Sequence, residues 1–177
     1  MLNLMMEKFN RIEKEWINTL ETRDVAKVIS TIFEIKNSGS VNILPVLFKM
    51  INRHTDSQIR NEILKLLGEI KSKEAVPVII DSLKTNNFGD YLPSFLAGCW
   101  MSGLDFSKYL TFFAGIFIRE DYQSAIEAFT VIEESLPNAT DSDKMECIRF
   151  LHESDCMVND AKMPLYKELR KVVEDNY

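Results

Sequence analysis

A pattern that occurs twice between residues 24 and 86 places the strongest constraint on how this chain can fold. In each copy an aspartate (Asp24, Asp56) precedes a run of helically spaced apolar residues, and a proline (Pro45, Pro77) stands near the start of a second such run. Equivalent positions are about 32 residues apart, a period typical of repeated helix pairs. The pattern therefore predicts two copies of one helical hairpin.

Both runs of each copy have the spacing of a helix with one buried face. We expect each aspartate to cap the first helix and each proline to lie in the opening turn of the second, where its missing N–H costs little. The apolar faces are Val25, Val28, Ile29, Ile32 and Ile35 with Leu44, Leu47, Phe48 and Ile51 in the first copy, and Ile59, Ile63, Leu66, Leu67 and Ile70 with Val76, Ile79, Ile80 and Leu83 in the second.

The triplet Glu-Ile-Lys also occurs in both copies, at residues 34–36 and 69–71. The triplets are about three residues further apart than the prolines. We expect a longer, glycine-containing connection at residues 37–42 of the first copy to absorb this difference, because loops tolerate changes in length.

The segment Leu67-Gly68-Glu69-Ile70-Lys71, followed by Ala75-Val76-Pro77-Val78-Ile79, resembles the HEAT repeat family, and the resemblance covers residues 24–86. It implies an all-α fold, a right-handed α-α superhelix or α-solenoid. We expect about four HEAT-like helix pairs in a single domain, 1–177. The pairs are 24–53, 56–86, 91–119 and 121–155, with an N-terminal capping helix at 1–22 and a C-terminal one at 160–177.

The later pairs keep the period but not the motif. In the last pair the expected apolar faces are Tyr122, Ala125, Ile126, Phe129 and Ile132, then Met145, Ile148 and Leu151, with a capping box at Thr140 and Asp143. The N-terminal capping helix should bury Phe9, Ile12, Trp16 and Leu20, and the C-terminal one, after Pro164, should bury Leu165, Tyr166, Leu169, Val172 and Val173.

Resemblance to HEAT proteins implies that the second helix of each pair lines the concave side of the solenoid, an extended docking face. This predicts a non-catalytic protein-binding scaffold or adaptor. The outward positions of these helices, here called the predicted row, change from basic to acidic along the chain and are Lys49, Arg53, Asp81, Lys84, Lys108, Phe112, Glu146, Arg149 and Glu153.

The charge distribution indicates what kind of partner this would be. The net charge of −6 opposes binding to nucleic acid, which depends on basic residues. Residues 1–88 are nearly balanced in charge, whereas acidic residues dominate residues 89–177. We therefore expect a protein partner, with a basic surface if it faces the C-terminal half. A dedicated inhibitor or immunity-type protein that masks a basic partner is the main alternative to an adaptor.

An enzyme is the remaining alternative, because some HEAT-like solenoids are alkylpurine DNA glycosylases with aromatic residues near an acidic one. Residues 91–122 contain Phe95, Trp100, Phe106, Tyr109, Phe112, Phe113 and Phe117 beside Asp105 and Arg119. Such an enzyme needs a basic groove, and this region offers only Lys108 and Arg119. We interpret the aromatic residues as core, packed closely at Gly98, Gly103 and Gly115.

No other pattern predicts chemistry. Cys147, His152 and Cys156 lack a fourth ligand and a common face for zinc, and a calcium loop starting at Asp141 fails because Glu146 occupies its glycine position. Nucleotide-binding and hydrolase motifs are absent from the sequence. We expect no catalytic residue, cofactor or metal.

The remaining features favour the cytoplasm. Residues 1–10 do not resemble a signal peptide, and the most apolar run, Tyr109–Ile118, is too short to span a bilayer and predicts a buried helix. The cysteines Cys99, Cys147 and Cys156 form no even set, so we expect buried thiols. No contact with a membrane is expected.

Overall fold

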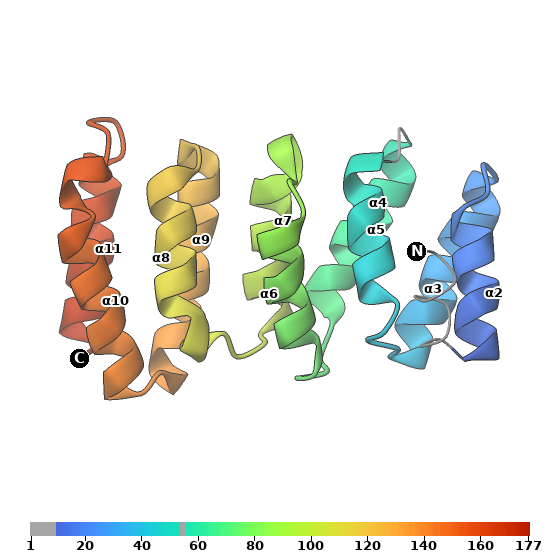
Figure 1. Cartoon of the computed structure of the whole chain (residues 1–177), viewed down its shortest axis with the longest axis horizontal. Coiled ribbons are helices and arrows are strands. Elements are labelled where there is room, and N and C mark those ends of the chain that lie inside the picture. The colour runs from blue at the N-terminus through green and yellow to red at the C-terminus, as the bar shows by residue number, and fades with distance from the viewer. Residues whose placement is uncertain (1–9, 54–55) are drawn as a thin grey trace. The chain divides into compact units, whose positions relative to one another are not determined.

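The computed structural model describes residues 10–53 and 56–177, and every regular element in this part of the chain is helical (Figure 1). The prediction of an all-α fold is therefore confirmed. The chain divides into two compact units, residues 1–91 (unit 1) and 92–177 (unit 2), and each is described by itself. We predicted a single repeat domain over residues 1–177. Whether the two units form one continuous domain is not tested by the structure of each unit, so this stays a prediction.

In unit 1 the helices pack on near neighbours along the chain. Helix α3 packs against α2 and α5, and α4 packs against α5 and α6. Each of α3 and α4 thus contacts the second helix after it, as expected where helix pairs repeat. The elements are α2 (Arg11–Leu20), α3 (Val25–Ser38), α4 (Leu44–Arg53), α5 (Ser57–Glu69), α6 (Ala75–Thr85) and the 3₁₀ turn η1 (Gly89–Tyr91).

The helix starts of unit 1 follow the sequence rules. The Asp24 carboxylate accepts a hydrogen bond from the Lys27 N–H at 3.1 Å, and Asp56 accepts one from Gln58 N–H at 2.8 Å. These carboxylates satisfy amides that have no acceptor within the helix. Pro45 is the second residue of α4 and Pro77 the third of α6, so both lie in the first turn. The predicted caps and proline positions are confirmed.

The two copies are equivalent in their core but not at the Glu-Ile-Lys triplets. Residues 34–36 lie within α3, whereas Glu69 is the last residue of α5 and Ile70 is its C-cap. The connections, residues 39–43 and 70–74, are equally long, so the expected longer connection in the first copy is wrong. The triplets are displaced by about one helical turn because the buried positions, not the triplets, set the alignment of α3 with α5.

Helix α2 buries a different face from the one expected. Ile12 is 57% exposed, whereas Ile17 and Leu20 are buried, and Phe9 lies outside the described residues. The helix begins with a capping box between Asn10 and Glu13, and this places the Glu13 side rather than the Ile12 side inward.

Glu13 is buried because its carboxylate is fully engaged. It accepts hydrogen bonds from Asn10 N–H at 2.9 Å, from the Ser40 hydroxyl at 2.6 Å and from the Asn42 amide at 3.3 Å. Burial acts to raise the pKa of Glu13, but these hydrogen bonds outweigh it and lower the pKa. The carboxylate therefore joins α2 to the connection between α3 and α4.

Unit 2 repeats this mode of packing with different sequence. Helix α9 packs against α7 and α8, α10 packs against α8 and α11, and α11 also contacts α9. The elements are α7 (Leu92–Ser102), η2 (Ser107–Tyr109), α8 (Leu110–Arg119), α9 (Tyr122–Ser135), η3 (Leu136–Asn138), α10 (Asp141–Glu153), η4 (Asp155–Met157) and α11 (Met163–Asp175).

Aromatic side chains form much of the core of unit 2. Phe95, Phe106, Phe113 and Phe117 are buried, and the Phe106 and Phe113 rings meet edge to face at 5.5 Å. The interpretation of the aromatic residues as core is confirmed for these four and wrong for Trp100, which is exposed, while Tyr109 and Phe112 are half-buried. The buried helix expected over Tyr109–Ile118 is confirmed. Gly103 does not serve close packing, because it ends α7 in the left-handed region at φ 66° with open space around it.

The buried faces of the last helix pair are rotated from those expected. Tyr122, Ile126 and Met145 are exposed, which contradicts the prediction. Ala125 and Ile132 are buried as expected, and α9 also buries the small residues Ser124 and Ala128, because its close neighbours α7 and α8 leave little room for larger ones. In α10 the buried residues are Cys147 and Leu151.

Helix boundaries near the C-terminus are mostly as predicted. The capping box of Thr140 and Asp143 at the start of α10 is confirmed. Helix α11 does not begin after Pro164, because Pro164 is already its second residue. Tyr166, Leu169 and Val173 are buried as expected, and Leu165 and Val172 are half-buried.

Two side chains of the C-terminal segment bond to main-chain carbonyls of earlier helices. The Lys162 ammonium group donates to the carbonyls of Phe117, Ile118 and Glu120 at 2.9, 2.7 and 2.8 Å, at the C-terminal end of α8. The Tyr166 hydroxyl donates to the Leu151 carbonyl in α10 at 2.5 Å. A cation at this end of a helix also complements the helix dipole.

The cysteines differ in burial. Cys99 and Cys147 are buried, whereas Cys156 is exposed on η4, so the prediction of three buried thiols is wrong at Cys156. Burial raises the pKa of the Cys147 thiol to about 12, with a smaller contribution from Glu146, and burial raises the pKa of Cys99 further still. Among the described residues, no helix is both long and apolar enough to cross a bilayer.

Candidate functional site

The predicted row falls into two groups. Lys49 and Arg53 on α4 and Asp81 and Lys84 on α6 belong to unit 1, where α4 and α6 pack together. All four side chains are exposed. Lys49 and Arg53 are one turn apart, so the basic charge lies on one face of α4.

The other five predicted residues belong to unit 2. Lys108 lies on η2, and Glu146, Arg149 and Glu153 lie on α10, which contacts η2. These four side chains are exposed. Phe112 is only half-buried, and its ring meets the edge of Phe113 at 5.5 Å, so part of it belongs to the core. The row is thus almost entirely polar where it is exposed.

Exposed apolar side chains concentrate elsewhere, on helices α7 and α9 of unit 2. Trp100 and Met101 on α7 are 37% and 59% exposed, and Tyr122 and Ile126 on α9 are 50% and 39% exposed. These four residues are called the α7–α9 patch below. Large exposed apolar residues are tolerated singly, but a cluster on neighbouring helices is typical of an interaction site.

One hydrogen bond joins the two halves of the α7–α9 patch. The indole N–H of Trp100 donates to the Glu127 carboxylate at 2.8 Å, from α7 to α9. Ile126 precedes Glu127 in the chain, and Tyr122 lies one turn before Ile126 on the same face of α9. Trp100 thus lies beside Glu127 where the two helices meet, and Ile126 and Tyr122 lie on the exposed face of α9.

The charged residues on the two helices of this patch are all acidic. Of the described α-helices, only α7 and α9 contain neither Lys nor Arg. Helix α9 contributes Glu127, Glu133 and Glu134, while Asp121 caps its start and interacts with the charge of Lys162. By helical phase, Glu133 and Glu134 lie on the same exposed side of α9 as Ile126. Helix α9 thus presents exposed carboxylates as well as exposed apolar residues.

Sequence reasoning assigned three members of this patch, Trp100, Tyr122 and Ile126, to the core. Tyr122 and Ile126 fit a helical stripe, but Ser124, Ala128 and Val131 fit a second stripe that the structure buries instead. The available signal was that α9 has more apolar residues than one face can hold, while α7 has no charged residue at all.

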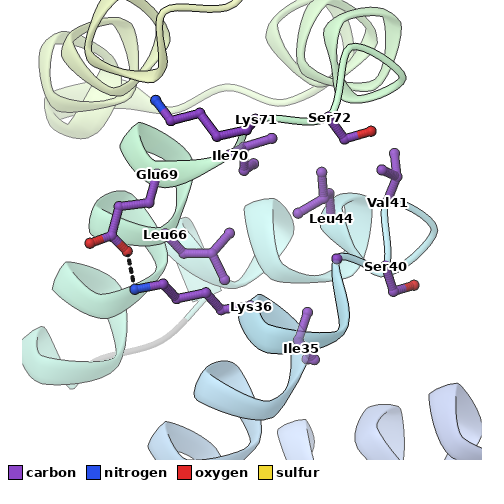
Figure 2. A pocket seen from close by; sticks show the side chains of 11 residues that line it. Ile35, Lys36, Ser40, Val41, Leu44, Leu66, Glu69, Ile70, Lys71 and Ser72 are labelled. Carbon is purple, nitrogen blue, oxygen red and sulfur yellow. Dashed lines mark ion pairs between the residues drawn. The ribbon is translucent and has the colours of Figure 1, made fainter.

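A pocket lies in unit 1, beside the connection between α3 and α4. It is a pocket of about 260 Å³ between the end of α3, the α3–α4 connection and the end of α5 (Figure 2). Ile35, Leu44, Leu66 and Ile70 supply apolar walls. Its volume suits one or two side chains of a partner rather than a large cofactor.

Polar groups border this pocket. Lys36 at the end of α3 forms an ion pair with Glu69 at the end of α5, with 2.5 Å between Nζ and Oε2, drawn as a dashed line in Figure 2. Ser40, Lys71 and Ser72 complete the polar border. The Lys36–Glu69 pair is well exposed and therefore adds little stability.

The residues considered for zinc do not assemble into a metal site. Cys147 is buried and Cys156 exposed, and His152 instead contacts Glu174 at 3.1 Å and Arg170 at 3.0 Å, between α10 and α11. Within residues 10–53 and 56–177, no group of three or more potential ligands could hold a metal ion. His152 thus serves contact between helices.

The chain was compared with known proteins. No protein-family model, no curated protein and no solved structure matches it.

Proposed function

We propose that this protein is a non-catalytic protein-binding scaffold or adaptor, built as a HEAT-like α-solenoid. The observation that carries the proposal is the α7–α9 patch, where four large apolar side chains stay exposed on two adjoining helices. Exposed apolar surface of this kind costs free energy unless a partner covers it.

The helix contacts within each unit support the solenoid part of the proposal. In unit 1, α3 contacts α5 and α4 contacts α6; in unit 2, α7 contacts α9 and α8 contacts α10. This alternation is what stacked helix pairs produce, and such stacks present long rows of exposed side chains. The predicted row and the α7–α9 patch lie on different sets of helices.

The dedicated inhibitor remains a second candidate because of one observation. Helix α9 combines the carboxylates of Glu127, Glu133 and Glu134 with exposed apolar residues, and neither α9 nor α7 contains a basic residue. A face of this composition favours a basic partner held tightly at its centre. A glycosylase has less support, because Phe95, Phe106, Phe113 and Phe117 are buried and cannot stack on a base.

Affinity capture with the full chain as bait tests the proposal. Native lysate is passed over wild-type bait and over two variants, Arg53→Glu/Glu153→Lys on the predicted row and Trp100→Ala on the α7–α9 patch. Retained proteins are quantified by mass spectrometry, and the leading candidate is purified and titrated calorimetrically. We expect a stoichiometric protein partner whose affinity falls at least about tenfold with one of these variants.

Different outcomes separate the candidate functions. Several partners of moderate affinity would favour the adaptor, and one tight, salt-sensitive partner would favour the inhibitor. If no protein binds stoichiometrically, or if release of a modified base from DNA is measured, the protein-binding function is wrong.

A further inference from the structure

We infer that the α7–α9 patch is a docking site for a basic amphipathic helix of a partner protein, with apolar residues on one face and Lys or Arg beside them. This inference rests on the proposed protein-binding function and specifies the site and the chemistry of the partner. It is carried by exposed apolar residues on two adjoining helices and by the exposed carboxylates of Glu133 and Glu134 on one of them.

The apolar centre has the form that receives a helix. Trp100 and Met101 project from α7, Tyr122 and Ile126 project from α9, and α7 and α9 are packed against each other. Two rows of side chains on adjoining helices form a surface into which apolar residues spaced by three and four can fit. Trp100 is the expected anchor, because tryptophan is enriched among residues that dominate binding energy.

Trp100 is also held in place before any partner arrives. Its indole N–H donates to Glu127 at 2.8 Å, which fixes the ring across the junction between α7 and α9. A fixed anchor loses little conformational entropy on binding, so more of the contact energy contributes to affinity.

The charge pattern selects a basic partner. Glu133 and Glu134 lie on the exposed side of α9, and neither α7 nor α9 contains a Lys or Arg. Asp121, at the start of α9, is already engaged by Ser124 and by the charge of Lys162. A helix with Lys or Arg along one edge would therefore find complementary charge over α9.

The same pattern disfavours other occupants. A second copy of the chain would place carboxylates of α9 opposite each other in a twofold contact, which is unfavourable. Phosphates of nucleic acid and anionic lipid surfaces would meet the same carboxylates and be repelled.

The test uses the full chain and a defined probe. The probe is a synthetic Leu/Lys peptide patterned as an amphipathic helix. One reference peptide has the same composition in scrambled order, and the other has Glu in place of every Lys. Binding is measured by calorimetry and by Trp100 fluorescence in the Trp16→Phe background, where Trp100 is the only tryptophan. We expect the Leu/Lys helix to bind and to shift the Trp100 emission, and both reference peptides to bind at least about tenfold more weakly.

Matched variants locate the site. Met101→Ser and Ile126→Ser should each weaken binding about tenfold, whereas Met145→Ser, which alters an exposed apolar residue of α10, should leave it unchanged. Glu133→Gln/Glu134→Gln should weaken binding and reduce its salt dependence, while Glu153→Gln on the predicted row should do neither. Circular dichroism checks that every variant keeps its helices.

Several results would overturn the inference. Binding that is insensitive to Met101→Ser and Ile126→Ser, or equal binding of the Glu-containing peptide, would exclude this site or this chemistry. If Met145→Ser and Glu153→Gln are the variants that weaken binding, docking occurs on the predicted row, and the inference fails while protein binding stands. Self-association in sedimentation that Met101→Ser abolishes would identify a second copy as the occupant instead.

Discussion

In unit 1 a surface ion pair, Lys36–Glu69, joins the ends of successive first helices, whereas in unit 2 Lys162 reaches inward to three main-chain carbonyls at the end of α8. The ion pair is made by residues about 40% exposed, but Lys162 is only 3% exposed. Water competes for the first contact and is largely excluded from the second.

This difference explains why the repeat motif can fade in unit 2 while the packing order persists. In unit 1 the contacts between helix pairs follow the repeated sequence, so a change in one copy leaves the rest in place. In unit 2 the C-terminal segment is bonded to α8 by one residue, Lys162, and to α10 by one residue, Tyr166. Loss of Lys162 should therefore cost more stability than loss of the Lys36–Glu69 ion pair.

Lys162→Met should produce the largest effect. It leaves three carbonyls at the end of α8 without their donor, and we expect a loss of about 3 kcal/mol in the free energy of unfolding of unit 2. Urea denaturation is followed by Trp100 fluorescence in the Trp16→Phe background. Lys167→Met, which alters an exposed lysine of α11, is the control and should change stability little. Equal stability of both variants would contradict the comparison.

Asp56→Ala should have an intermediate effect in unit 1. The substitution removes the acceptor for the free amides at the start of α5, and we expect a loss of about 1 kcal/mol. The measurement is urea denaturation followed by Trp16 fluorescence in the Trp100→Phe background. Asp81→Ala, within α6, is the matched control. A larger loss than for Lys162→Met would reverse the proposed order of sensitivity.

The ion pair of unit 1 should contribute least. A double-mutant cycle of Lys36→Ala and Glu69→Ala should give a coupling energy below about 0.5 kcal/mol, because both side chains remain well exposed to water. The coupling should decrease further in 1 M salt. A coupling above about 1 kcal/mol would show that unit 1 depends on a specific polar contact as unit 2 does.

The predictable part of the fold is the part set by local sequence rules. The caps at Asp24, Asp56 and Thr140 and the proline positions depend on a few consecutive residues, so the sequence was sufficient for them. The all-helical class follows from the same periodicity.

The misassigned residues depend on contacts between distant segments. Ile126 and Ala128 both lie on an apolar stripe of α9, and only the close approach of α7 and α8 decides that the smaller residue is buried. Lys162 gives no signal in the sequence, because its partners are carbonyl groups more than 40 residues earlier. The same limit applies to the site, since exposure of Trp100 depends on the packing of α7 against α9.

The uneven burial of the three cysteines has a practical use. Thiol reagents attack the thiolate, and Cys99 and Cys147 are inaccessible with raised pKa values, so only Cys156 is open to reaction in the folded protein. Cys156 lies on η4, outside both α7 and α9. Maleimide coupling at this one natural position can thus immobilise the chain on a sensor in a uniform orientation, without modifying any residue of the α7–α9 patch.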